Sequence, residues 1–218
     1  YAKAKEVVAS GAAKLSAEMN KTGKVNGAFT QLKKRKIQEA NRKAADGARI
    51  SKDCKIVLGD FRKHLSSVAD GSVSLIFTDP PYDEKSVAIY EDVFRDAQRL
   101  LCDGGSMITY AGQYAIPAIL KMAEPFLKFF WIIAMIQEGS SGRMFGFGVR
   151  MGWKPLLWFV KGDGRRENNM MTDLVHSDAP SKDAHPWQQG ITEALHCIDH
   201  LTKPGELVVD PFLDQGPR

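Results

Sequence analysis

The chain has 218 residues, 44% of them hydrophobic, which is enough for one α/β domain with an appendage. No apolar run approaches the roughly 18 residues of a membrane span, and the first residues lack a signal-peptide pattern, so we expect a soluble, intracellular protein. Its three cysteines, Cys54, Cys102 and Cys197, are too scattered for a disulfide framework or a metal knuckle.

The basic character belongs to the N-terminal part. The whole chain has a net charge of +4, whereas residues 1–50 contain 12 Lys+Arg and 4 Asp+Glu, so the remainder carries −4. A helix is expected from Thr30, its N-cap, to Gly47, its stop. Its basic residues would attract nucleic acid in a salt-sensitive way, or form an ordinary solvated face, and both interpretations stay open. The densest group is Lys33, Lys34, Arg35 and Lys36.

Beyond residue 50, helix and strand patterns alternate. The apolar runs predict strands at 54–58, 73–78, 105–110, 129–136, 155–160 and 206–210, and helices at 60–69, 87–102, 113–127 and 187–201. This alternation predicts a Rossmann-like, doubly wound α/β sheet over residues 51–218, with an antiparallel edge formed by the consecutive strands after 129. By composition, 138–152 and 162–184 are predicted to be loops, and 1–50 a basic helical segment.

The tetrapeptide Asp79-Pro80-Pro81-Tyr82 follows the strand expected at 73–78. In an open α/β sheet, ligands bind at the carboxyl ends of strands. The Asp79 carboxylate and the Pro80 carbonyl can each accept one hydrogen of an exocyclic amino group, such as adenine N6 or cytosine N4. The prolines fix the backbone and carry no competing N–H, and Tyr82 offers a stacking surface worth about 1–3 kcal/mol. The alternative is a simple strand-ending turn.

Three further segments accompany the tetrapeptide. Leu58-Gly59-Asp60-Phe61 follows a strand pattern, His185-Pro186-Trp187-Gln188-Gln189 opens a helix, and a second buried-strand pattern ends in Asp210-Pro211-Phe212. In this order, over roughly residues 53–213, the segments resemble the β group of S-adenosylmethionine-dependent DNA amino-methyltransferases. By that resemblance, Asp79, Pro80, Pro81 and Tyr82 would form the pocket for the target base.

The resemblance also implies a site for S-adenosylmethionine next to Asp79. Asp60 would face the adenosine part of the cofactor, His185 and Pro186 would help to close the site, and Asp210, Pro211 and Phe212 would lie on its methionine side. In this family, aspartate at the head of the tetrapeptide goes mostly with adenine N6 and serine with cytosine N4, so we expect adenine methylation. Cytosine-N4 methylation and a non-catalytic nucleic-acid-binding relative remain the alternatives.

The implied partner is double-stranded DNA with the target base flipped out of the stack. Four arginines in the expected loops, which match the family's target-recognition positions, are candidates for DNA contacts: Arg143, Arg150, Arg165 and Arg166. The resemblance also favours a cytoplasmic protein of bacterial, phage or plasmid context, with no membrane association and a possible homodimer. No metal site is expected, because His196 and His200 lack the glutamate of a zinc-protease motif.

The chain departs from the family after Phe212. Where the family has Phe-x-Gly-x-Gly, followed by a helix and a strand, this chain ends Phe212-Leu213-Asp214-Gln215-Gly216-Pro217-Arg218. Glycines in such a loop allow a ligand to approach the backbone, so the C-terminal part of the cofactor site is missing. Either a loop is omitted after Leu213 or the protein is a degenerate relative. We favour omission, because the target-base side is intact and the chain starts at Tyr1 rather than Met.

Overall fold

The computed structural model describes residues 2–29, 31–32, 52–81, 87–137, 142–164, 170–177 and 191–213. It divides into two compact units, one containing the described residues up to Lys55 and the other those from Ile56 onward. Within the described residues we find no helix with the length and apolarity that a transmembrane span requires.

The smaller unit is helical. It contains α1 (Ala2–Ala9), α2 (Ala13–Thr22) and a further helical segment at 25–29. Gly23 ends α2 with φ of 66°, a left-handed conformation that favours glycine, and its N–H donates to the Met19 carbonyl. Most of the helix predicted from Thr30 to Gly47 lies outside the described residues. Five side chains form the core of this unit: Val7, Leu15, Met19, Ala28 and Leu32.

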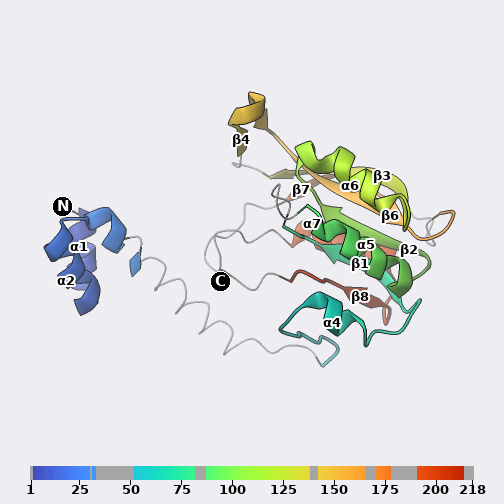
Figure 1. Ribbon diagram of the computed structural model, residues 1–218, viewed down its shortest axis with the longest axis horizontal. Helices are drawn as coiled ribbons and strands as arrows, with labels where there is room; N and C mark the ends of the chain where they lie inside the picture. The colour runs from blue at the N-terminus through green and yellow to red at the C-terminus, as the bar shows by residue number, and fades with distance from the viewer. Residues whose placement is uncertain are drawn as a thin grey trace. The chain divides into compact units, whose positions relative to one another are not determined.

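The larger unit is built on a six-stranded sheet (Figure 1). Strands β8, β1 and β2 are parallel, β6 is antiparallel to β2 and β3, and β7 is parallel to β3. In spatial order the strands are β7 (Leu174–Ser177), β3 (Lys128–Gln137), β6 (Lys154–Val160), β2 (Leu101–Tyr110), β1 (Val73–Thr78) and β8 (Leu207–Val209). A separate hairpin consists of β4 (Gly142–Met144), η2 (Phe145–Phe147) and β5 (Val149–Met151).

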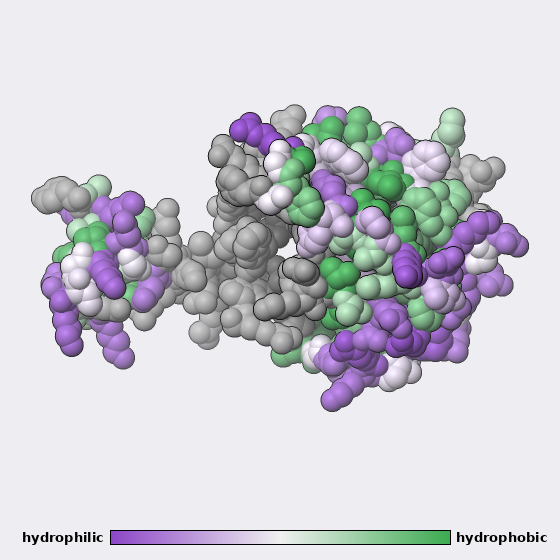
Figure 2. All heavy atoms as spheres, turned by 45° about the horizontal axis from the view of Figure 1, so that its top comes forward, coloured by the Kyte–Doolittle hydropathy of each residue, from purple (hydrophilic) through white to green (hydrophobic). Residues whose placement is uncertain are grey.

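Helices cover both faces of the sheet (Figure 1). One face packs against α4 (Phe61–Leu65), α5 (Ile89–Leu100) and α6 (Ile116–Ala123), which follows η1 (Gln113–Ala115), and the other packs against α7 (Thr192–Leu201). Successive strand residues alternate between the two cores. Met107 and Phe159 belong to the α5 side, whereas Ile108 and Trp158 belong to the α7 side. On the face that Figure 2 shows, hydrophobic residues reach the surface of this unit between groups of hydrophilic ones.

The predicted doubly wound α/β sheet is confirmed, with corrections to three segments. Residues 54–58 form no strand, and Ile56 and Leu58 are exposed. An apolar run becomes a strand only where a neighbour supplies hydrogen-bond partners.

The segment 162–184 was predicted to be a loop, but it contains β7. β7 pairs in parallel with β3, so the edge strand of the sheet is β7 and not a member of the antiparallel β3–β6 pair. The loop predicted at 138–152 contains the β4–β5 hairpin.

Candidate active site

Asp79 and Asp210 follow two neighbouring parallel strands. β1 ends at Thr78 and β8 ends at Val209, and the two strands pair in parallel, with Ile76 opposite Val209. Their carboxyl ends therefore meet at the edge of the sheet where α/β proteins bind ligands. The hydroxyl of the buried Thr78 donates a hydrogen bond to Oδ1 of Asp210 at 2.8 Å, which ties the two strand ends together.

The Asp210 carboxylate also organises the turn that follows β8. Its Oδ1 accepts a hydrogen bond from the Phe212 N–H at 2.9 Å, as in an Asx turn. The residue as a whole is exposed, but this oxygen faces inward toward Thr78. Burial of the carboxyl raises the pKa of Asp210, while the hydrogen bonds from Phe212 and Thr78 act in the opposite direction.

Phe212 connects this turn to α4. Its ring lies 4.9 Å, centroid to centroid, from the ring of Phe61, the first residue of α4. Asp60 is the N-cap of α4 and accepts a hydrogen bond from the Arg62 N–H at 3.0 Å. The Arg62 guanidinium also pairs with Asp92 at 2.8 Å. The structure thus brings three predicted cofactor residues, Asp60, Asp210 and Phe212, to one side of the sheet edge.

Asp79 lies at the start of the tetrapeptide, on the α7 side of the sheet. Leu75 and Phe77 of β1 face that side, and alternation places Asp79 with them. Asp79 is half-buried, Pro80 is buried and Pro81 is exposed. Asp79 therefore lies at the strand end as a half-buried residue, and the Oδ1 oxygen of its carboxylate is buried.

A polar cluster beside Asp79 was missed by sequence reasoning. The hydroxyl of Tyr110, at the end of β2, donates to Oε1 of the buried Glu193 at 2.5 Å. Burial, followed by the Glu193 charge, raises the pKa of Tyr110. Burial lowers the pKa of Lys154, while the charges of Asp79 and Glu193 raise it. The sequence did contain one signal for this cluster. Glu193 is spaced from Cys197 and Leu201 so that all three lie on the same face of α7, which predicts a buried Glu193 side chain.

Other predicted residues are placed only in part. Pro211 is half-buried between Asp210 and Phe212. Arg150 is exposed on β5, and its backbone pairs with that of Arg143 on β4. The remaining predicted site residues lie outside the described part of the chain, and their roles stay predictions: Tyr82, Lys33, Lys34, Arg35, Lys36, Arg165, Arg166, His185 and Pro186.

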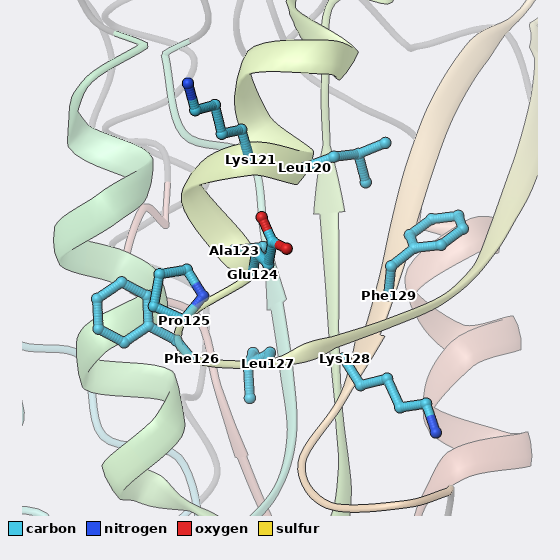
Figure 3. A pocket seen from close by; sticks show the side chains of 9 residues that line it. All are labelled: Leu120, Lys121, Ala123, Glu124, Pro125, Phe126, Leu127, Lys128 and Phe129. Carbon is cyan, nitrogen blue, oxygen red and sulfur yellow. The ribbon is translucent and has the colours of Figure 1, made fainter.

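A surface hollow lies elsewhere in the larger unit (Figure 3). It is lined by the end of α6, the connection to β3 and the start of β3, from Leu120 to Phe129. β3 runs in the same direction as β1 and β2. Its start therefore lies at the amino edge of the sheet, where the parallel strands begin. This hollow therefore lies at the opposite edge from Asp79 and Asp210.

No family model matches the chain. Solved structures do match. The PvuII DNA methyltransferase, which is cytosine-N4-specific, is 17% identical over 70% of this chain and 72% of its own, with a TM-score of 0.58. M1.HpyAVI, solved as a complex with S-adenosylmethionine, is 20% identical over 74% and 84%, with a TM-score of 0.57. A protein of Thermus thermophilus, provisionally classed as a DNA modification methylase, is 18% identical over 71% and 77%, with a TM-score of 0.56. The larger unit therefore has the Rossmann-like fold seen in DNA methyltransferases.

Proposed function

We propose that this protein is an S-adenosylmethionine-dependent DNA methyltransferase that modifies adenine N6. One observation carries the proposal: Asp79 and Asp210 stand at adjacent ends of the parallel strands β1 and β8, joined through the Thr78–Asp210 hydrogen bond. The predicted target-base residue and a predicted cofactor residue thus follow neighbouring strands at the same end of the sheet. The fold shared with M1.HpyAVI and the PvuII DNA methyltransferase supports the methyltransferase class.

The chemistry of the target side follows from the tetrapeptide. The Asp79 carboxylate and the Pro80 carbonyl accept the two amino hydrogens, which localises the nitrogen lone pair and directs it away from the ring. Pro80 and Pro81 keep these acceptors still because their φ angles are fixed. Flipping the base costs a few kcal/mol, and stacking on Tyr82 offsets part of that cost. No strong base is required, since the amino proton becomes acidic once the nitrogen is alkylated.

The residues at the end of β8 suit S-adenosylmethionine chemically. This cofactor, when bound, supplies an electrophilic methyl group on a sulfonium. The Arg62 guanidinium already lies 4.9 Å from the centroid of the Phe61 ring, so the face of Phe212 is the one that favours a nearby cation from the cofactor. The carboxylates of Asp60 and Asp210 offer acceptors for hydroxyl and amino groups. We expect His185 and Pro186 to close this side.

The Asp79→Ala variant tests the mechanism. Because Asp79 acts on the transferring nitrogen, we expect methyl incorporation into DNA to fall by at least about 10²–10³-fold. Cofactor affinity, measured by calorimetry, should be nearly unchanged, because the side chain is required for the transition state rather than for binding. Retention of turnover by this variant would show that the mechanism is wrong.

Cytosine N4 is the second candidate target, because the PvuII enzyme has the same fold and is cytosine-N4-specific. Nucleoside analysis of DNA methylated by the wild-type protein separates the two: N6-methyladenine supports our proposal, and N4-methylcytosine replaces it. A non-catalytic relative would bind DNA, yet give no calorimetric signal with S-adenosylmethionine.

A further inference from the structure

A row of three polar side chains crosses β1, β2 and β6 at the carboxyl edge of the sheet. Asp79 follows β1, Tyr110 ends β2 and Lys154 begins β6, which runs in the opposite direction. Alternation places Asp79 on the face of Phe77, and Lys154 on the face of Leu156, and both of these pack in the α7-side core with Tyr110. The three side chains therefore share one face, on adjacent strands about 5 Å apart.

Glu193 on α7 lies against this row. Its side chain is fully buried, and its Oε1 accepts the hydrogen bond from the Tyr110 hydroxyl. Its other oxygen, Oε2, has no hydrogen-bond partner among the described residues. A buried carboxylate is costly unless a cation or further donors compensate for the lost water. The neighbouring cation is Lys154, whose charge responds to both Glu193 and Asp79.

One ammonium group can serve both carboxylates. A lysine ammonium has three donors, and a carboxylate has about four acceptor positions. Asp79 can therefore accept a hydrogen bond from Lys154 and still offer an oxygen to the amino group of a base. Glu193, which is fixed by Tyr110, would act on the ammonium through its charge.

We propose that Lys154 and Glu193 are positioning residues that hold the Asp79 carboxylate in the orientation needed to accept a hydrogen from the target amino group. The proposal depends on the proposed function for its chemistry and on the shared face of the three strands for its geometry. A displaced acceptor reduces the rate of transfer more than the binding of DNA, because the hydrogen bond strengthens as the nitrogen becomes tetrahedral.

The kinetic test uses the full chain and compares Lys154→Met with Lys154→Arg. We expect Lys154→Met to lower kcat for methyl transfer by about 10–100-fold, since small misplacements of a catalytic group have effects of this size. The KM for DNA should stay within about threefold, and Lys154→Arg should restore most of the rate. Lys128→Met, at the amino edge, is the matched control and should leave kcat unchanged. Equal kcat values for wild type and Lys154→Met would overturn the proposal.

A second measurement is independent of catalysis. Lys154→Met and Glu193→Gln should each lower the midpoint of urea unfolding, and the double variant should lower it by less than the sum, because the two groups interact. Additive shifts would contradict an electrostatic interaction between Lys154 and Glu193, and with it the proposal. A wild-type protein that methylates no DNA would refute the proposed function instead, and the urea measurement would still decide whether Lys154 and Glu193 are coupled.

Discussion

At the scale of single residues, the hydrogen bond between Thr78 and Asp210 joins two strand ends of the candidate site. These residues are 132 positions apart in the sequence, yet their side-chain oxygens lie 2.8 Å apart. Because Thr78 is buried, water cannot take the place of its hydroxyl. A variant without the hydroxyl therefore leaves Oδ1 of Asp210 with one hydrogen-bond donor fewer. We expect Thr78→Val to reduce the free energy of unfolding by about 1.5–3 kcal/mol, the usual range for a hydrogen bond to a charged group. Thr78→Ser keeps the hydroxyl and is the matched control.

The pH dependence of this loss has a definite sign. Burial raises the pKa of Asp210 in the folded state, so ionisation of this carboxyl disfavours folding as the pH rises through its titration range. The Thr78 hydrogen bond offsets part of that cost, because it favours the charged form. The loss in free energy of unfolding caused by Thr78→Val should therefore be small in acid and should grow toward neutral pH. Urea unfolding curves recorded across this pH range measure it. A deficit that stays constant with pH would show that the hydroxyl does not act through the carboxylate.

At the scale of elements, Arg99 joins α5 to the connection between α4 and β1. Its guanidinium donates to the carbonyl oxygens of Leu65 and Val68, each at 2.9 Å, and pairs with Asp70. A lysine ammonium cannot reproduce this planar fork. We expect Arg99→Lys to lower the free energy of unfolding by about 1–2 kcal/mol, the net value of two hydrogen bonds.

Arg95, one turn earlier on the same helix, provides the control. It is exposed, pairs with the exposed Glu91 and with Asp92, and its guanidinium lies 5.8 Å from the centroid of the Phe126 ring. Surface ion pairs of this kind contribute little, so Arg95→Lys should change stability by less than about 0.5 kcal/mol. Equal losses in the two variants would mean that the carbonyl contacts of Arg99 do not stabilise the fold.

The elements also show where sequence patterns suffice. β1, β2, β3, β6 and β8 were predicted, because each is an apolar run beside a turn signal. Residues 54–58 have the same character, yet form no strand, because pairing depends on neighbours that a local pattern does not contain. β7 was missed because its four residues alternate between exposed and buried within a polar stretch. Similarly, the contact of Tyr110 with Glu193 joins residues 83 positions apart, which only the packing of α7 on the sheet brings together.

At the scale of the whole molecule, charge is separated along the chain. Residues 1–50 carry +8 and the rest −4, so attraction to DNA phosphates is expected to come chiefly from the N-terminal part. The double variants Lys33→Gln/Lys34→Gln and Arg35→Gln/Lys36→Gln test this. Each double variant should reduce the slope of log K for DNA binding against log salt concentration by up to about 1.8. The slope changes by roughly 0.9 for every phosphate that is no longer neutralised. DNA binding measured by fluorescence anisotropy across a salt series gives these slopes.

The matched control is Lys121→Gln/Lys128→Gln, which removes the same charge from the amino edge of the sheet. Since the amino edge lies opposite Asp79 and Asp210, this variant should keep the wild-type slope. Equal slopes for all variants would identify the basic group as a solvated surface and leave duplex binding to the arginines of the larger unit. A selective effect would instead mean that affinity comes from one part of the chain and chemistry from another, so Asp79→Ala should abolish transfer without changing the salt dependence.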